Sequence, residues 1–285
     1  MTDENSLVGR AMLVTGAASG FGFVMSTAFL EAGARVALTD VGPDRARELA
    51  ATLERFADRA VYVPADLRRS EELDNLVRAV RDRFGAVDVL VNNAGVAPGI
   101  VRRDYVTEPV RFWEHSLAQT QMFFAVNAIA PFRLAVELAP QMIERGWGRI
   151  INVTTSLGSM LRAGMAGYGG SKAALEVHTA IFAGDLAGTG VTANVLVPGG
   201  VSNTPMVPLE SGFDRASLIQ PEAMVPPALW LASVNSDGIT GKRFVAAYWD
   251  PSLPVSAALE KAVAPIAWSA LGEQTIFPPN YVQRT

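Results

Sequence analysis

The stretch Thr15-Gly16-Ala17-Ala18-Ser19-Gly20-Phe21-Gly22 follows a short apolar run and precedes a segment with helical periodicity. Glycine permits positive φ angles and close backbone approach, and the first turn of the following helix offers free N–H groups to an anion. An ordinary glycine-rich turn between a strand and a helix has the same composition. Its position after the first strand favours a turn that binds the phosphates of a dinucleotide.

The rest of the chain continues this alternation of short apolar runs and longer helical segments. Runs rich in Val, Ile and Leu without strict alternation are typical of parallel strands buried on both faces. We predict strands at residues 11–15, 35–39, 60–64, 87–91, 149–153, 192–197 and 243–247. We predict helices at residues 22–32, 44–56, 71–84, 112–145 and 167–187. The pattern indicates an α/β fold with a Rossmann-like, doubly wound parallel sheet.

Prolines and linkers bear on how this pattern is divided. Pro131 and Pro140 allow the helix at 112–145 to form two pieces. No internal repeat or low-complexity linker interrupts the sequence, so one domain is predicted over residues 1–285. Residues 198–227, rich in Pro, Gly and Ser, are expected to form a long loop with a short helix. Residues 248–285 are expected to be an extension that covers the substrate site or an oligomer interface.

Composition excludes several classes of function. The net charge of −4 and the lack of a basic block argue against nucleic-acid binding. The absence of cysteine excludes disulfides, thiolate catalysis and zinc–cysteine sites. The two histidines, His115 and His178, are far apart in sequence and predict no metal site. The acidic start is unlike a signal peptide and the apolar runs are too short for a membrane span, so a cytoplasmic protein is expected.

Tyr168 and Lys172 lie four residues apart, on one face of the predicted helix at 167–187. A cation about 4 Å from a phenol, at an effective dielectric constant near 20, favours the phenolate by about 4 kcal/mol. We therefore expect the pKa of Tyr168 to fall from its usual value by at most about three units, before the cost of desolvation. Most such pairs are surface contacts, so this pair indicates proton transfer only together with other motifs.

Asp40 ends the second predicted strand, 18 residues after Gly22. A carboxylate there can accept hydrogen bonds from the ribose hydroxyls of a dinucleotide, and it repels a 2′-phosphate. A solvated aspartate at a strand end is the alternative. Ser19 and Val41 supply no cation for a 2′-phosphate, although Arg45 is close in sequence. The charge pattern favours NAD over NADP.

Several short motifs occur in a fixed order along residues 8–248. They are the glycine turn at 15–22, Asn92-Asn93-Ala94-Gly95 after the fourth strand, Asn127, the hydroxyls after the fifth strand, Tyr168-x-x-x-Lys172 and Pro198-Gly199. Each motif is modest, but the ordered set is hard to obtain by chance. The chain therefore resembles the short-chain dehydrogenase/reductase family. The resemblance implies an NAD(H)-dependent oxidoreductase that interconverts a secondary alcohol and a ketone by hydride transfer.

The resemblance also implies which residues bind the cofactor. The matching positions are Gly16, Ser19, Gly20, Phe21, Gly22, Asp40, Asp66, Leu67, Asn93, Ala94, Gly95, Tyr168, Lys172, Pro198, Gly199 and Val201. In the family, the residue at the position of Asp66 binds the adenine amino group. Asp66 is equally suited to cap the helix that follows it, and both roles are compatible.

The resemblance assigns the catalytic roles in the same way. Tyr168 is expected to be the general acid/base, with Lys172 holding the nicotinamide ribose. Asn127 is expected to bind a water molecule in a proton relay. It precedes Pro131 by four residues, so its carbonyl lacks the usual helical donor and water can enter. A buried asparagine that bonds to the backbone is the alternative.

The chain departs from the family at the catalytic hydroxyl. The family usually has a serine 13 residues before the tyrosine, and here that position is Thr155. Threonine keeps the hydroxyl donor, although its methyl group takes up space and restricts χ1. Ser156 follows directly and can serve if the loop shifts by one residue. We favour Thr155 on spacing.

The sequence leaves the substrate, the direction of reaction and its stereochemistry open. Loops at 96–111, 157–167 and 203–226 follow the carboxyl ends of strands, where such folds bind substrates. They carry Arg102, Arg103 and Arg162, which we expect to be solvated; if Arg162 faces the pocket, a carboxylated substrate becomes plausible. The alternatives are an NADPH-dependent 3-oxoacyl-thioester reductase and a regulatory protein without turnover. A small alcohol or ketone and a second copy of the chain, in a dimer or tetramer, are the expected partners.

Overall fold

The described residues of the computed structural model, 6–42 and 44–268, build one sheet in the order β3-β2-β1-β4-β5-β6-β7-β8. The parallel strands are β1 (Ala11–Thr15), β2 (Arg35–Thr39), β3 (Ala60–Tyr62), β4 (Val89–Asn92), β5 (Gly148–Val153), β6 (Val191–Val197) and β7 (Lys242–Val245). The seven predicted parallel strands are confirmed within about two residues. An eighth strand, β8 (Val263–Pro265), pairs antiparallel with β7 and was not predicted.

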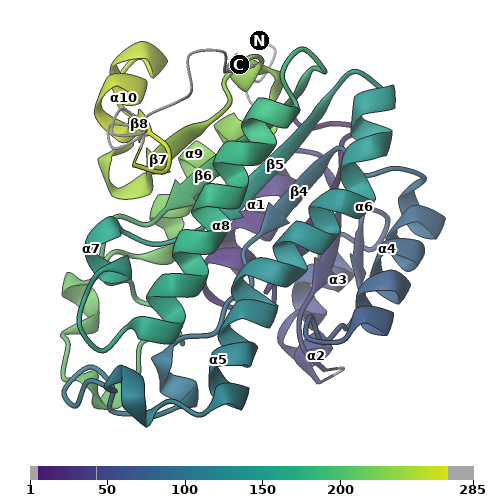
Figure 1. Ribbon diagram of the computed structural model, residues 1–285. Helices are drawn as coiled ribbons and strands as arrows, with labels where there is room; N and C mark the ends of the chain where they lie inside the picture. The colour runs from purple at the N-terminus through teal and green to yellow at the C-terminus, as the bar shows by residue number, and fades with distance from the viewer. Residues whose placement is uncertain (1–5, 43, 269–285) are drawn as a thin grey trace, which may run out of the picture.

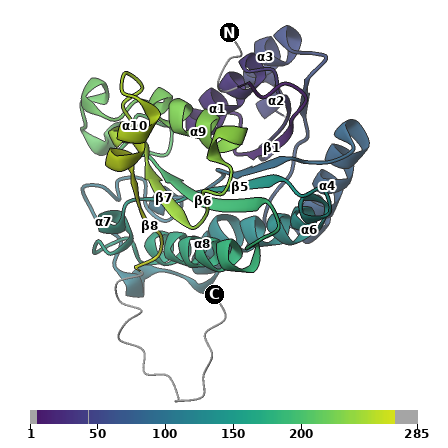
Figure 2. The ribbon, with the colours of Figure 1, turned by 90° about the horizontal axis from the view of Figure 1, so that it is seen from above.

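Helices cover both faces of this sheet (Figures 1 and 2). One face packs against α1 (Gly20–Glu31) and α9 (Val225–Ala232), and the other against α4 (Ser70–Phe84), α6 (Ala130–Glu144) and α8 (Ala166–Asp185). The remaining helices are α2 (Arg45–Glu48), α3 (Ala50–Arg55), α5 (Leu117–Phe124), α7 (Leu157–Met160) and α10 (Val255–Ala262). The predicted doubly wound α/β fold is therefore correct.

The central strands contribute side chains to the hydrophobic cores on both faces of the sheet, because successive side chains point to opposite faces. In β1, Met12 and Val14 join the core beneath α1 and α9, whereas Leu13 joins the core beneath α4 and α6. All five residues of β1 are buried. This two-sided burial explains why the strands are continuous apolar runs rather than alternating ones.

The helix predicted at 112–145 begins later than expected, and a π-helical segment just before Pro131 separates it into two α-helices. Ser116 caps α5, its Oγ accepting from the Gln119 N–H, and the chain then passes through a π-helical segment, Ala125–Ile129, into α6. Pro131 lies in the first turn of α6, where a missing N–H costs little. Helix α6 continues through Pro140, so of the two prolines only Pro131 lies near the division. Residue 136, whose carbonyl loses its donor at Pro140, is half exposed, and water can satisfy it.

One helical run among the described residues, Leu117–Glu144, is long and apolar enough to cross a membrane by length and composition alone. Half of its most apolar window is buried in the fold, against β4, β5 and α8. The π-helical turn that carries Asn127 interrupts the α-helical geometry within this run. These contacts make it a helix of the protein core.

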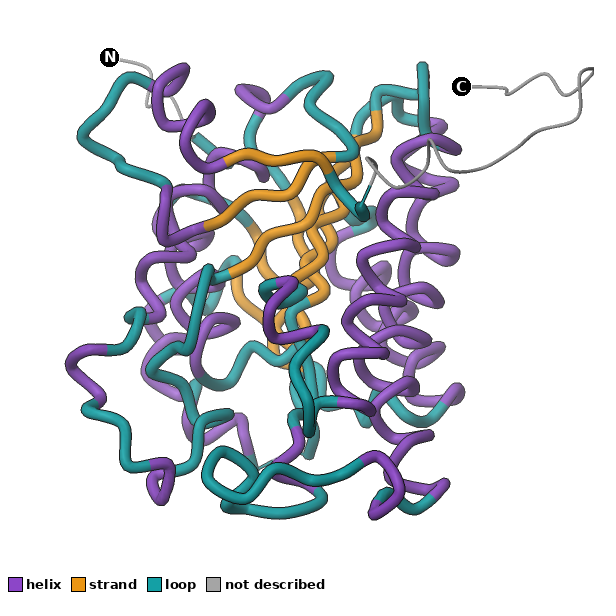
Figure 3. Tube along the Cα trace, turned by 60° about the vertical axis from the view of Figure 1, so that its left-hand side comes forward, coloured by secondary structure: helices purple, strands orange, loops and turns teal. Residues whose placement is uncertain are grey.

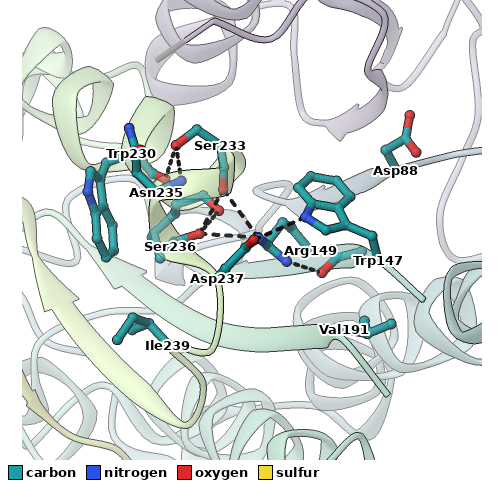
Figure 4. A network of polar contacts seen from close by, with 12 residues as sticks. Asp88, Trp147, Arg149, Val191, Trp230, Ser233, Asn235, Ser236, Asp237 and Ile239 are labelled. Atoms are coloured by element: carbon teal, nitrogen blue, oxygen red, sulfur yellow. Dashed lines mark hydrogen bonds and ion pairs between the residues drawn. The ribbon is translucent and has the colours of Figure 1, made fainter. Parts of the chain in front are cut away.

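At the amino end of β5 a buried arginine joins the sheet to the segment before β7 (Figure 4). Arg149 is fully buried, forms an ion pair with Asp237, and donates from Nε to the Ser236 Oγ at 3.1 Å. Its guanidinium lies 4.1 Å from the centre of the Trp147 ring. This network ties the amino ends of the strands together, while the long loops gather beyond the other end of the sheet (Figure 3).

The two irregular regions differ in how well they were predicted. Residues 198–224 form the expected loop, with short 3₁₀ turns before α9. The described part of the extension, up to residue 268, contains α10 and β8, and Ile266 packs on Val195 and Val197 of β6. Residues 269–285 lie outside the described residues, so the covering role predicted for 248–285 stays a prediction.

Candidate active site

The turn between β1 and α1 can be built only with glycine at several positions. Gly16 and Gly20 have φ angles of +64° and +53°, which side chains disfavour. A Cβ added to Gly22 would lie 2.0 Å from the Gly16 carbonyl oxygen. A Cβ on Gly16 would lie 2.8 Å from the Cα of Ala94. The close approach of these backbones leaves the N-terminus of α1 open to an anion.

The loop after β4 is fastened to this glycine turn. The Asn93 side-chain amide donates to the carbonyls of Thr15 at 2.9 Å and Gly16 at 3.0 Å. The Thr15 Oγ1 accepts from the N–H groups of Asn93 and Ala94, both at 3.0 Å. The strand order reverses between β1 and β4, which is where doubly wound folds bind ligands. Sequence reasoning did not assign a role to Thr15.

Asp40 reaches back to the glycine turn from the end of β2. Its Oδ2 accepts from the Ala18 N–H at 3.1 Å and its Oδ1 accepts from the Val41 N–H at 2.8 Å. Each carboxylate oxygen keeps a further lone pair for a hydroxyl donor. Arg45, also at this end, pairs with Glu48 at 2.6 Å.

Asp66 does not cap the following helix, so that alternative is wrong. Helix α4 begins at Ser70, and its N-cap residue is Arg69. The Asp66 Oδ1 instead accepts from the Arg68 N–H at 3.0 Å, and the carboxylate pairs with the Arg68 guanidinium at 2.5 Å. These hydrogen bonds lower the pKa of Asp66. The turn, rather than the helix, is what this aspartate stabilises.

Tyr168 and Lys172 are buried on the same face of α8, but the predicted effect on the Tyr168 pKa is wrong. Burial raises the pKa of Tyr168 to about 12, partly offset by a side-chain hydrogen bond with Thr155. The Lys172 Nζ donates to the Val153 carbonyl at 2.8 Å, and burial lowers the pKa of Lys172 to about 8. Desolvation is the largest cause of both shifts, and it disfavours the charged form of each group.

The two candidate hydroxyls have different surroundings. Thr155 lines the cavity together with Tyr168, and its hydroxyl lowers the pKa of that phenol. Ser156 is the N-cap residue of α7, where its Oγ accepts from the Ser159 N–H at 3.3 Å. A shift of the loop by one residue would remove this cap. The geometry favours Thr155.

Asn127 lies in the π-helical segment and is completely buried. Its Oδ1 accepts from the Val96 N–H at 2.8 Å, and its Nδ2 donates to the Val96 carbonyl and to the Ser171 Oγ. The side chain therefore bonds mainly to backbone, as the alternative reading proposed. Pro131 still deprives the Asn127 carbonyl of its usual donor, so the same residue keeps an acceptor for water.

A cavity of about 830 Å³ brings these elements together. It is lined by most of the residues singled out from the sequence, namely Gly16, Ser19, Gly20, Phe21, Asp40, Asp66, Leu67, Asn93, Ala94, Gly95, Thr155, Tyr168, Lys172, Pro198 and Val201. Gly22, Asn127, Ser156 and Gly199 do not line it. The first two act behind its wall, through the packing and hydrogen bonds described above.

All three predicted substrate loops contribute to the cavity wall. Arg103 and Arg162 line it, whereas Arg102 pairs with Glu114 at 2.7 Å. Tyr105, which the sequence did not single out, is buried beside Met165 and Tyr168 and also lines the cavity. A lone tyrosine in a variable loop carries no spacing signal, so only the fold could identify it.

The buried ammonium leads to a prediction about stability. Lys172→Met is expected to raise the free energy of unfolding by up to about 3 kcal/mol, because burial lowers the Lys172 pKa by about two and a half units. The unfolded chain binds more protons between pH 8 and 10.5, so wild-type stability rises with pH across this window. The advantage of the variant should be full below pH 8 and vanish above 10.5.

Urea unfolding at pH 7 and pH 10 tests this expectation. The contribution of Tyr168 to the free energy of unfolding decreases only above pH 10. It does so in both the wild type and Lys172→Met, so it cancels from the difference between them. Lys261→Met, at an exposed lysine of α10, is the matched control and should change little. An equal gain from both variants, or a gain independent of pH, would contradict a penalty at Lys172.

Comparisons with known proteins agree with this geometry. Residues 10–211 match the model of a family described as short chain dehydrogenase. The chain is 30% identical over 246 residues to a 2,5-dichloro-2,5-cyclohexadiene-1,4-diol dehydrogenase of Sphingobium indicum, covering 83% of this chain and 94% of the relative. It is 29% identical over 252 residues to a 5-keto-D-gluconate 5-reductase of Escherichia coli, covering 85% and 95%.

A solved structure is similar over nearly its whole length. It is a gluconate 5-dehydrogenase from Burkholderia cenocepacia in complex with NADP and tartrate, with a TM-score of 0.73 and 27% identity, covering 85% of this chain and 95% of that chain. The shared fold, the family match and the glycine turn beside the tyrosine pocket agree on one assignment. The chain belongs to the short-chain dehydrogenase family of nicotinamide-dependent oxidoreductases that act on CH–OH groups.

Proposed function

We propose that this protein interconverts a secondary alcohol and a ketone with NAD(H), with Tyr168 as the general acid/base. The observation that carries the proposal is that Thr155, Tyr168 and Lys172 line the same cavity as the glycine turn. The dinucleotide fits that turn because the turn carries no side chain where the phosphates would lie. A side chain on Gly22 would meet the Gly16 carbonyl, so only glycine lets the two backbones lie this close and leaves the N-terminus of α1 open. When bound, it supplies or accepts a hydride at its nicotinamide ring.

The chain's own residues then handle the proton. Tyr168 donates a proton to the carbonyl oxygen of a ketone, or accepts it from the alcohol, while the Thr155 hydroxyl donates a hydrogen bond to the same oxygen. Lys172 passes the proton on toward water, and the Asn127 main-chain carbonyl is the acceptor that would hold that water. Both side chains lie beside Gly95, where an added Cβ would be 3.3 Å from the Lys172 Nζ and from the Asn127 Oδ1. Glycine thus keeps this relay space open.

Charges at the adenosine end support NAD as the preferred cofactor. The Asp40 carboxylate repels a 2′-phosphate, and the nearby arginines, Arg45 and Arg68, are each paired with a carboxylate. The similar gluconate 5-dehydrogenase was solved with NADP, so the preference in this chain depends on its own charges. Asp40 is therefore the residue to test.

Asp40→Asn is expected to raise the ratio of kcat/KM with NADP to that with NAD by about 30-fold. Removing one charge about 5 to 8 Å from the 2′-phosphate, at an effective dielectric constant near 20, relieves about 2 kcal/mol. Steady-state kinetics with both cofactors measure the ratio. Asp58→Asn, exposed and away from the cavity, is the control. A wild-type enzyme that already prefers NADP would contradict the NAD assignment.

The substrate end of the cavity favours an acidic substrate. Arg103 and Arg162 form no ion pair with any residue that the structure describes, and the Arg162 Nη2 meets only the Met165 sulfur at 3.9 Å. Glu210 adds one negative charge to the same wall, which leaves the balance positive. Two of the three similar proteins described above are named for 5-keto-D-gluconate or gluconate, and the third is named for a neutral diol. We infer a hydroxy or keto acid as the substrate class.

Turnover assays with paired substrates test the function and the substrate class together. With NAD, D-gluconate should give a kcat/KM at least tenfold above that of the neutral polyol D-sorbitol. Equal rates would remove the acid preference but keep the dehydrogenase. Turnover of a 3-oxoacyl thioester with NADPH alone would support the reductase alternative. Cofactor binding without turnover of any alcohol would support the regulatory alternative.

An exposed apolar stripe supports the predicted homo-oligomer. It contains Ile129, Phe132, Val136 and Ile143 on and beside α6, with Val177 and Ile181 on α8. Spacings of three, four and seven residues place such side chains on one helix face, and exposed apolar faces of this kind mark interfaces. We propose that two copies pair through this stripe, which sedimentation velocity of wild type and Ile181→Lys would test. The predicted cytoplasmic location stays a prediction.

A further inference from the structure

Three successive residues at the carboxyl end of β5 are each held by a charged side chain. The contacts are Lys172 Nζ to the Val153 carbonyl at 2.8 Å, Thr154 Oγ1 to the Glu176 Oε2 at 2.9 Å, and Arg243 Nη2 to the Thr155 carbonyl at 2.5 Å. Only the first of these belongs to the pair that the family resemblance identifies. The other two converge on the residues that carry the catalytic hydroxyl.

Glu176 and Arg243 also bind each other. The Arg243 Nη1 forms an ion pair with the Glu176 Oε2, and their side chains are 12% and 4% exposed, respectively. Glu176 lies one helical turn after Lys172 on α8, and Arg243 comes from β7 on the far side of β6. The ion pair therefore connects α8, β7 and the carboxyl end of β5 at one buried position.

A buried ion pair is a poor device for stability alone. Desolvating two charges costs several kcal/mol per ion, and apolar side chains of similar size often stabilise a fold as well or better. Here the ion pair fixes an orientation, because the planar guanidinium can hold the Glu176 carboxylate and the Thr155 carbonyl at once. Neither side chain lines the cavity, so neither touches the substrate or the cofactor.

We propose that Glu176 and Arg243 form a positioning pair that fixes the backbone of residues 154 and 155 and so aims the Thr155 hydroxyl at Tyr168. This inference rests on the proposed function, in which that hydroxyl and Tyr168 act on the same substrate oxygen. The extra methyl group of threonine narrows the choice of rotamer, so the backbone that carries it must be held firmly.

Loosening the pair should act on rate and on proton affinity together. A displacement of the reacting groups by about 1 Å can cost about 100-fold in rate. The Thr155 hydrogen bond also lowers the pKa of Tyr168, so its loss should raise the pKa of the catalytic base. The other titratable groups around the phenol, Tyr105 and Lys172, stay unchanged in the variants below, as does Arg162 next to Tyr105.

The experiment compares Arg243→Met, Arg243→Lys and Glu176→Gln in the full-length protein. We expect kcat for alcohol oxidation to fall about 10- to 100-fold in Arg243→Met. The fall should be smaller in Arg243→Lys, which keeps the charge but not the planar guanidinium. It should also be smaller in Glu176→Gln, which keeps the shape of the side chain. The rising limb of the pH profile should move to higher pH. The Kd for NADH, measured by fluorescence, should stay within about twofold.

Asp237→Asn is the matched control, because it breaks the Arg149 ion pair at the opposite end of the same sheet (Figure 4). It should lower the melting temperature without moving the pH profile. If Arg243→Met does not fold, Arg243→Lys and Glu176→Gln decide the question. A folded Arg243 variant with wild-type kcat and pH profile overturns the proposal, as does an equal pH shift in Asp237→Asn.

Tyr168→Phe separates this proposal from the function on which it rests. If that variant keeps full activity, the proposed function itself fails. If Tyr168→Phe is inactive while the Glu176 and Arg243 variants behave as wild type, the function stands and only the positioning pair is wrong.

Discussion

Tyr168→Phe should lower kcat by about 10²- to 10⁴-fold, the usual contribution of a positioned general acid/base. The phenol is buried and shares the cavity wall with Thr155, and a phenylalanine fills nearly the same space without the proton. Cofactor affinity should change little, since the ring stays in place. Single-turnover measurements with saturating NAD would isolate the chemical step from product release.

Tyr248→Phe is the control, because this tyrosine is 61% exposed and does not line the cavity. It should leave kcat and the melting temperature unchanged. If Tyr168→Phe retained kcat within tenfold of the wild type, Tyr168 would not be the acid/base. The proton would then have to move through another group, such as Tyr105, a phenol in the same buried cluster.

Gly22→Ala should weaken cofactor binding by at least about 100-fold, or about 2.7 kcal/mol. The new Cβ would lie 2.0 Å from the Gly16 carbonyl oxygen and 2.5 Å from the Asn93 side-chain nitrogen. Both neighbours belong to the walls of the phosphate-facing turn, so the turn must open to admit the methyl group. The Kd for NADH, followed by fluorescence or calorimetry, measures the loss.

Gly184→Ala makes the same chemical change in α8 at a position with no neighbour within 4 Å of the added carbon. It should stabilise the protein by about 0.5 to 1 kcal/mol, because alanine favours a helix over glycine, and leave cofactor affinity unchanged. A Gly22→Ala variant that bound NADH as tightly as the wild type would show that the turn adapts and that its glycines are not required.

The parallel core of the fold could be read from the sequence because its causes are local. Strands buried on both faces, such as β1, produce continuous apolar runs. The glycine turn marks the point where the chain passes from the first strand into the first helix. The strand β8 gave no such signal, since three residues ending in Pro265 carry no period. The helix through Pro140 was also beyond local rules, because its continuation depends on residue 136 facing solvent.

The site was predicted less completely than the fold for a related reason. Spacing along one helix brought Tyr168 and Lys172 together, but the size of their desolvation cost depends on everything packed around them. The sequence therefore gave the wrong direction for the Tyr168 pKa. Glu176 and Arg243 are 67 residues apart, and no motif links two positions on a helix and a distant strand.

The antiparallel strand β8 has a consequence for how the molecule behaves in a crowded solution. Without it, β7 would end the sheet and present a row of unpaired N–H and C=O groups, a template on which other chains can polymerise. Residues 263–265 occupy that edge, and Pro265, which has no N–H, makes the new border a poor acceptor of further strands. A chain cut after β7 would keep every residue of the cavity yet lose its guard against aggregation.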